Sequence, residues 1–269
     1  MPIIPRKVFK RFEKNVSKYQ GILKNAKDRD INEADTSTII QDILENVFGY
    51  DKYKEITAEF AIRSTFSDLA VKSNDNINFL VEVKAIGLEL KESHIRQAVS
   101  YGVNHGIQWV VLTNGIKWKI FRIRFEKPVN YELIYLLNFL EINPKDLKDQ
   151  EKLFLLCKEG LNKDAIEEFH EHIKNVNRFT IAALVLNDTV LNVIRRELRR
   201  ISEGLLVDID EIEKIIRNEI LKREVIEGKE SDEAMARVKK CAGKIIKKGR
   251  KSKLKEETAP SEEKLPAQQ

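Results

Sequence analysis

The spacing of apolar residues changes along this 269-residue chain, and these changes limit the folds that it can adopt. Over roughly 5–26 and 32–48, apolar residues recur at steps of three and four, which is typical of amphipathic helices. Between about 55 and 125, short runs rich in β-branched and aromatic residues indicate strands. Helical spacing returns from about 143. The pattern therefore predicts an α/β part followed by an α-helical part.

The central part predicts five strands in two groups. Three consecutive strands are expected in "EITAEFAI", "FSDLAVKS" and "INFLVEVKA", and two more in "WVVLTNGIKWKIFRIRF", joined at Asn114-Gly115. A helix over about 91–104 separates the groups and is expected to be a crossover connection. We predict a mixed sheet flanked by helices in domain 1–142, a helical domain over 143–228, and a basic, largely disordered tail over 229–269.

The stretch "FLVEVKAIG", which begins in the third predicted strand, carries two charges inside an apolar run. Side chains alternate along a strand, so Glu82 and Lys84 share one face while their apolar neighbours share the other. If the preceding strand pairs with it through a turn near residues 74–76, Asp68 lies near one end of the pair. The plain alternative is an exposed ion pair, which is worth about 0–1 kcal/mol.

Two carboxylates that face one space repel each other unless a cation lies between them. Mg²⁺ binds a few carboxylate oxygens and keeps several waters, and a nearby lysine can polarise such a water. Asp68, Glu82 and Lys84 are therefore sufficient for metal-assisted hydrolysis of a phosphodiester. In the following helix, "QAVSY" places Gln97 and Tyr101 on one face, where both can point toward the same pocket.

Residues from about 32 to 125 resemble the PD-(D/E)xK nuclease superfamily, and specifically the N-terminal nuclease domain of type I restriction enzyme R subunits. "NEADTSTIIQDILENVFGYD", "FSDLAV", "FLVEVKA", "RQAVSY" and "VVLTNG" carry the resemblance in that order. It implies a restriction-endonuclease-like fold and Mg²⁺, with Mn²⁺ as a substitute. The implied catalytic residues are Asp68, Glu82, Lys84, Gln97 and Tyr101, and the implied metal ligands are Glu33, Asp68 and Glu82, with Glu45 as the less favoured alternative to Glu33.

Two features depart from that family. Ser67 stands where the motif has proline before Asp68. The sequence also contains no "GxxxxGK[ST]" phosphate loop, so the ATP-driven translocase of full-length R subunits is not expected. We therefore expect a stand-alone relative, and leave open whether a separate translocase or methyltransferase partner exists.

Two basic segments are candidates for binding DNA phosphates. "IRRELRR" stacks arginines four residues apart on one helix, and residues 239–255 contain nine lysines and arginines and no acid. The net charge of +5 resides in this second segment. A solvated helix face and a solvated tail are the plain alternatives. The candidate contacts are Arg195, Arg196, Arg199, Arg200, Lys247, Lys248, Arg250 and Lys251. We expect Phe179, Ile181, Leu184 and Leu186 to form the core of the helical domain.

Composition excludes several other classes of protein. No apolar run is long enough to span a bilayer, and "MPIIPRKVFKRF" lacks the apolar region of a secretion signal, so we expect a cytoplasmic protein without a membrane partner. The two cysteines are far apart, and neither belongs to a CxxC pair, which argues against a disulfide framework and a zinc site.

The primary hypothesis is a Mg²⁺-dependent DNA endonuclease of the restriction type. The first alternative is a catalytically inactive nucleic-acid-binding or adaptor protein on the same fold. A third is a dimerisation scaffold built on the helical domain, with Glu82 and Lys84 as structure only. Cleavage of both DNA strands by an enzyme with one site would favour a homodimer.

Overall fold

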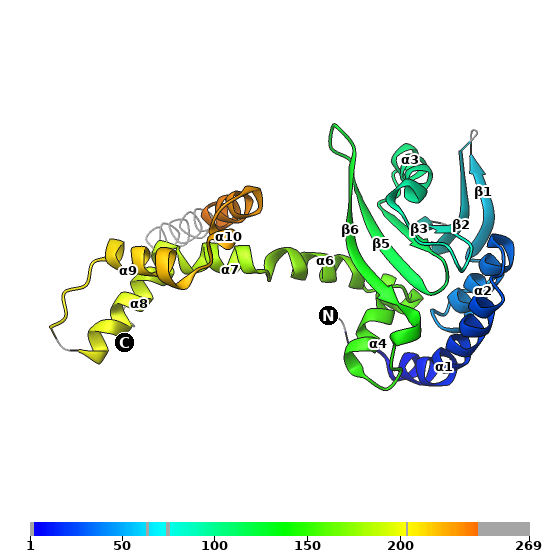
Figure 1. The fold of residues 1–269 in the computed structure, drawn as a ribbon, viewed down its shortest axis with the longest axis horizontal. Coiled ribbons are helices and arrows are strands. Elements are labelled where there is room, and N and C mark those ends of the chain that lie inside the picture. The colour runs from blue at the N-terminus through cyan, green and yellow to red at the C-terminus, as the bar shows by residue number, and fades with distance from the viewer. Residues whose placement is uncertain (1–2, 63–64, 74–75, 203, 242–269) are drawn as a thin grey trace, which may run out of the picture. The chain divides into compact units, whose positions relative to one another are not determined.

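The computed structural model describes residues 3–62, 65–73, 76–202 and 204–241 (Figure 1). The chain divides into two compact units, Met1–Glu171 and His172–Gln269. The first unit contains the sheet and the candidate active site. The second is helical.

The first unit is built on a six-stranded mixed sheet with the strand order β1-β2-β3-β4-β5-β6. Among the described strands, β3 and β4 alone pair in parallel, and α3 (Arg96–His105) connects them; the other neighbours are antiparallel. The predicted mixed sheet with a helical crossover is thus confirmed, and β6 adds a strand that the sequence did not indicate. The strands are β1 (Ile56–Ile62), β2 (Thr65–Ser73), β3 (Asn76–Val83), β4 (Trp109–Thr113), β5 (Lys117–Arg124) and β6 (Asn130–Asn138).

Helices cover both faces of the sheet (Figure 1). α1 (Arg6–Asp28) and α2 (Glu33–Asn46) pack on the face that carries Phe79, Val81 and Val83 of β3. The short helix η1 (Glu92–Ile95) and α3 pack on the opposite face, against Ala70 and Leu80. Both faces of β3 are therefore buried along most of its length, as its nearly continuous apolar sequence requires.

Asn114 fixes the β4–β5 turn and the segment that follows β3. Its side-chain oxygen accepts hydrogen bonds from the backbone N–H groups of Ile116 and Lys117, at 3.2 and 2.9 Å. Its side-chain nitrogen donates to the carbonyls of Ile86 and Leu88, at 3.2 and 3.0 Å. The predicted Asn-Gly turn thus also holds the chain just beyond the E-x-K segment.

The compact unit that contains the sheet extends past the expected boundary at residue 142 to Glu171. The 3-10 helix η2 (Phe139–Glu141) leads into α4 (Leu147–Phe154) and α5 (Lys158–Leu161). Apolar residues of 153–157, together with Ala165 and Ile166, belong to the same core as α1 and α2, which explains the extension. Helix α6 (Ala165–Asn175) contains the boundary between the two units.

The second unit has a small core. Leu191, Ile212 and Ile216 are its central buried residues. Ile181 and Leu184, which we expected in this core, are 52% and 46% exposed, because α7 buries Thr180, Ala182 and Ala183 instead. After the end of α6 and before residue 229, the helices of this unit are α7 (Arg178–Val185), α8 (Asp188–Ile201), α9 (Ile209–Ile215), the π-helix η3 (Ile216–Ile220) and α10 (Arg223–Ile226).

Residues 229–241, the first part of the predicted tail, are helical, and Ser231 and Ala234 are buried. The remainder of that tail, from 242 on, lies outside the described residues. Within the described part of the chain, no helix has the length and apolar character needed to cross a membrane.

Candidate active site

The site lies where β2 and β3 run side by side in antiparallel pairing. The register pairs Leu69 with Val81, and its continuation by one residue places Asp68 opposite Glu82. Lys84 directly follows β3, and its backbone N–H donates to the carbonyl of Thr113 at 2.8 Å, which extends the parallel pairing with β4. Three of the residues singled out from the sequence are thus brought to one place by backbone pairing.

The ammonium of Lys84 lies among three carboxylates. Its Nζ is 2.9 Å from Oε1 of Glu82, 3.4 Å from Oε1 of Glu33 and 4.0 Å from Oδ2 of Asp68. Glu33 is the first residue of α2, so this helix brings the third carboxylate to the sheet. Asn32 caps α2 by accepting a hydrogen bond from the backbone N–H of Asp35 at 2.9 Å, which fixes where the helix begins.

The environment disfavours negative charge on Glu82. Its side chain is only 7% exposed, and burial, with a further contribution from Asp68, raises its pKa to about 7 despite the hydrogen bond with Lys84. Burial also raises the pKa of Asp68, against the hydrogen bond from Val83 and the charge of Lys84. Burial alone would lower the pKa of Lys84, but the hydrogen bond with Glu82 and the neighbouring carboxylates outweigh it and raise that pKa.

Asp68 is held by the backbone as well as by charge. Its Oδ2 accepts a hydrogen bond of 2.7 Å from the N–H of Val83, the residue between Glu82 and Lys84. Ser67, at the position of the motif's proline, is buried, and its hydroxyl donates to the carbonyl of Leu69 at 3.3 Å. The substitution at 67 therefore leaves Asp68 in its place on β2.

Carboxylate oxygens are ligands that suit a hard divalent cation, but in this structure the Lys84 ammonium lies among them. Among the described residues, no three His, Cys, Asp or Glu side chains lie close enough together to hold a metal ion. Asp68 and Glu82 remain as an opposed pair of carboxylates, and Mg²⁺ is commonly bound by one or two protein carboxylates together with water and substrate phosphate. The two strand residues therefore fit this ion, whereas a ligand role for Glu33 stays a prediction.

Gln97 and Tyr101 both lie on α3, which covers the sheet face that carries Leu80 and, by alternation, Glu82. Gln97 is exposed, whereas Tyr101 is fully buried, with its ring 4.5 Å from that of His105. Burial raises the pKa of the Tyr101 phenol, so this side chain stays protonated at neutral pH. Catalytic roles for these two residues stay predictions.

A cleft of about 440 Å³ opens beside the carboxylates. Sequence reasoning did not identify Ser37 and Gln41 as part of this site, although both follow Glu33 at helical steps of four, a pattern that could have indicated them. The cleft is lined by Glu33, Ala34, Ser37 and Gln41 of α2, Ala58 of β1, Asp68 of β2 and Val83 of β3.

The predicted arginine contacts lie on α8, but acids and amides engage three of them. Glu197 accepts hydrogen bonds from Arg196 at 3.2 Å and from Arg200 at 2.9 Å, and Arg195 donates to Asn192 at 2.8 Å. A phosphate would have to compete with these neighbours. The four basic candidates between 247 and 251 lie outside the described residues.

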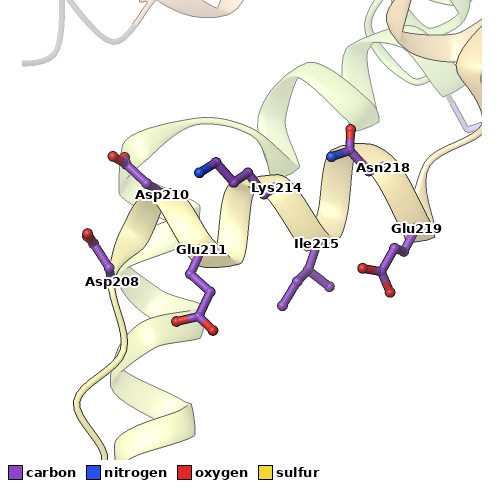
Figure 2. Close-up of a pocket in the computed structure, with 7 residues that line it drawn as sticks. All are labelled: Asp208, Asp210, Glu211, Lys214, Ile215, Asn218 and Glu219. Atoms are coloured by element: carbon purple, nitrogen blue, oxygen red, sulfur yellow. The ribbon is translucent and has the colours of Figure 1, made fainter.

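A second hollow, of about 380 Å³, lies on the surface of α9 and η3 (Figure 2). Figure 2 shows Glu211, Ile215 and Glu219 on one side of this helix, and Lys214 and Asn218 on another. Asp208 and Asp210 also line it, so carboxylates outnumber its one lysine. This surface therefore repels a polyanion such as DNA.

Comparison with known proteins supports the nuclease-like part of the chain. Residues 38–136 match the family described as the type I restriction enzyme R protein N terminus. The match confirms the resemblance predicted from the sequence and is consistent with a PD-(D/E)xK nuclease-like domain. It includes Asp68, Glu82 and Lys84 but begins after Glu33. No curated protein and no solved structure matched the chain.

Proposed function

We propose, from the match of residues 38–136 to the R protein N-terminal family, that the protein is a Mg²⁺-dependent DNA endonuclease related to restriction enzymes. One observation carries the proposal. Asp68 and Glu82 lie opposite each other on neighbouring strands, and the Lys84 ammonium lies 4.0 and 2.9 Å from their oxygens. Such a set combines a place for a cation with a positive group for a phosphate.

Asp68 and Glu82 would hold the ion. Mg²⁺ bound there, or Mn²⁺ in its place, would supply a Lewis acid and a more acidic water. The hydrogen bond from Val83 orients the Asp68 carboxylate in advance. Lys84 would donate a hydrogen bond to the attacking water or to a phosphate oxygen, and its raised pKa keeps it charged for that role. Gln97 and Tyr101 would orient the site or the DNA backbone.

The wider functional assignment follows from the same proposal. DNA is the proposed substrate and partner, the cytoplasm its proposed location, and restriction-modification or defence its proposed setting. A homodimer would bring two such sites to the two strands of a duplex.

Metal binding and DNA cleavage, measured in one buffer, test the proposal. Wild type is expected to bind Mn²⁺ in calorimetry and to nick supercoiled plasmid with Mg²⁺. Asp68→Ala and Glu82→Ala are expected to lose both, and Lys84→Ala to lose mainly cleavage, by at least about 100-fold. Glu89→Ala and Lys117→Ala replace exposed residues of the same types and serve as matched controls.

One observation favours the alternative of a DNA-binding or adaptor protein without turnover. The Lys84 ammonium already lies 2.9 Å from Glu82, in the place that a cation would take, as expected if the strand pair is kept only for structure. In that case wild type binds DNA but neither binds Mn²⁺ nor nicks plasmid, and Asp68→Ala leaves DNA affinity unchanged. This result would overturn the endonuclease proposal.

A further inference from the structure

The cleft beside the carboxylates contains a row of three polar side chains on α2. Glu33, Ser37 and Gln41 are four residues apart, so they lie along one face of this 14-residue helix. All three line the cleft that Asp68 also lines. At 1.5 Å per residue, the row is roughly 12 Å long, whereas a DNA strand advances about 3.4 Å per nucleotide. The row is thus as long as three to four nucleotides.

Ser37 and Gln41 are half-buried, and among the described residues neither side chain has a hydrogen-bond partner. The polar neighbours of this row on the same helix behave differently. Thr36 and Thr38 donate to the carbonyls of Asn32 and Ala34, at 2.7 and 3.2 Å. A hydroxyl and an amide that face the cleft are therefore available to a ligand.

The charge of the residues that line the cleft determines how it can contact a phosphodiester backbone. Helix α2 contains no lysine or arginine, and Glu33 and Asp68 contribute two carboxylates to the lining. Among the side chains of described residues that line this wall, Ser37 and Gln41 are the neutral donors that a phosphodiester backbone would meet. The Ser37 hydroxyl and the Gln41 amide can each donate a hydrogen bond to phosphate or sugar oxygens without adding charge.

We infer that Ser37 and Gln41 bind the sugar–phosphate backbone of the substrate strand, one to four nucleotides from the bond that is cut. This inference rests on the proposed endonuclease function. It adds that the substrate DNA strand runs along α2. Ser37 and Gln41 are positioning residues, because they act on neighbouring nucleotides and leave the reacting phosphate to Asp68, Glu82 and Lys84.

Binding and cleavage by single variants test the inference. Ser37→Ala and Gln41→Ala are each expected to weaken the affinity for a 20-base-pair duplex in Ca²⁺ by about three- to tenfold, equally for duplexes of different sequence. In Mg²⁺ they are expected to raise KM by the same factor and to leave kcat within about twofold. The slope of affinity against salt stays unchanged, because no charge is lost. Thr38→Ala, one residue away on another face, is the matched control and keeps wild-type affinity.

Gln41→Lys is expected to increase affinity, a result that a loss of folding cannot produce. A cation at the same place is expected to raise the affinity for the duplex and to steepen the salt slope by about 0.9, the value for one additional phosphate contact. Thermal melting of each variant establishes that the fold is intact.

The outcomes separate this inference from the proposed function. If Asp68→Ala abolishes cleavage while the Ser37 and Gln41 variants bind and cut like wild type, the endonuclease stands and the inference is overturned. If wild type binds but does not cut, and the Gln41 variants shift affinity as stated, the proposed function fails, while the contact of Ser37 and Gln41 with the DNA backbone stands without a position relative to a cut bond. Failure of wild type to bind duplex DNA at all would overturn both.

Discussion

The backbone N–H of Val83 donates a hydrogen bond of 2.7 Å to the carboxylate of Asp68, which fixes an acidic side chain of β2 to the segment that contains Glu82 and Lys84. Asp68→Asn keeps an oxygen acceptor for this N–H and removes a charge opposite Glu82, so its free energy of unfolding is expected to equal or exceed that of wild type. Asp68→Ala leaves the N–H without this acceptor and is expected to unfold about 1 kcal/mol more easily than Asp68→Asn. Urea unfolding measures both. Equal stability of the two variants would contradict a structural role for the bond.

Glu82 makes the stability of the sheet depend on pH. Its pKa of about 7 in the folded chain lies above the ordinary value of 4.5, so the folded state holds an additional proton between these values and loses stability as pH rises from about 4.5 to 7. Glu82→Gln resembles the protonated form. Without metal it is expected to be more stable than wild type at pH 8 by about 1–3 kcal/mol, and no more stable at pH 4. Thermal melting at the two pH values measures the difference, and a gain of equal size at both would contradict it.

His170 is expected to have the opposite effect on stability. Its Nδ1 lies 2.5 Å from a guanidinium nitrogen of Arg122, which can only donate, so Nδ1 must accept and Nε2–H donates to Glu132 at 3.1 Å. Burial and the charge of Arg122 lower the pKa of His170 below 6.5, against the attraction of Glu132 and Glu171. The stability that neutral His170 contributes is therefore present above pH 6.5 and is lost as pH falls through the lowered pKa.

His170→Gln removes this titration. Below pH 6.5 its free energy of unfolding is expected to depend less on pH than that of wild type. His172→Gln, an exposed histidine two residues away, is the matched control and is expected to follow the wild-type curve. Chemical unfolding from pH 7.5 to pH 5 compares the three proteins, and parallel curves for His170→Gln and wild type would contradict the assignment of the neutral form.

Arg11 joins three segments of the first unit. Its guanidinium donates two hydrogen bonds to Glu159 of α5, at 2.9 and 2.7 Å, and others to the carbonyls of Val47 and Phe48 at the end of α2. Both charged side chains are mostly buried, so Arg11→Ala is expected to lower the free energy of unfolding by about 2–3 kcal/mol. Lys7→Ala, which removes the exposed lysine that also pairs with Glu159, is expected to cost less than about 1 kcal/mol. A similar cost for both variants in urea unfolding would contradict this reading.

The arginines of α8 are expected to add to DNA affinity only as far as Glu197 releases them. Glu197→Gln frees Arg196 and Arg200 from an acidic partner and is expected to strengthen duplex binding about two- to fivefold at low salt. Replacing both arginines by glutamine is expected to weaken binding and to flatten the salt slope by up to about 1.8. Fluorescence anisotropy over a salt series measures both. An unchanged slope in the double variant would assign the arginines to a solvated helix face.

The strands at the centre of the sheet could be predicted from local sequence patterns, because the residues of each strand by themselves show which side chains share a face. Side chains alternate along β3 and into Lys84, which follows it, so Glu82 and Lys84 share one face and Phe79, Val81 and Val83 share the other. This alternation is a property of the extended backbone and needed no tertiary structure. β6 lacks such a signal. It is an edge strand, and its Leu133 and Leu136 are about half exposed. Its apolar residues therefore do not all lie on a buried face, and its sequence lacks the alternation of apolar and polar residues that would indicate a strand.

Features that depend on how elements pack together could not be predicted from local patterns. The cleft at Ser37 and Gln41 exists because α2 approaches β1 and β2, and the spacing of these residues alone did not show what they face. The prediction that Ile181 and Leu184 of α7 are core residues was wrong for a related reason. Small Ala182 and Ala183 allow close packing of that helix and displace the larger Ile181 and Leu184 to the surface.

The Lys84 ammonium has a consequence for how the proposed enzyme responds to its metal. It is a cation attached to the protein within 2.9 to 4.0 Å of all three carboxylates, so an incoming divalent ion competes with a charge that cannot diffuse away. The apparent metal affinity would therefore be lower than that of the carboxylates alone, in proportion to the fraction of time for which the ammonium is away from them. If the two strand carboxylates bind Mg²⁺ as proposed, the enzyme would need a higher Mg²⁺ concentration to fill the site than it would without Lys84.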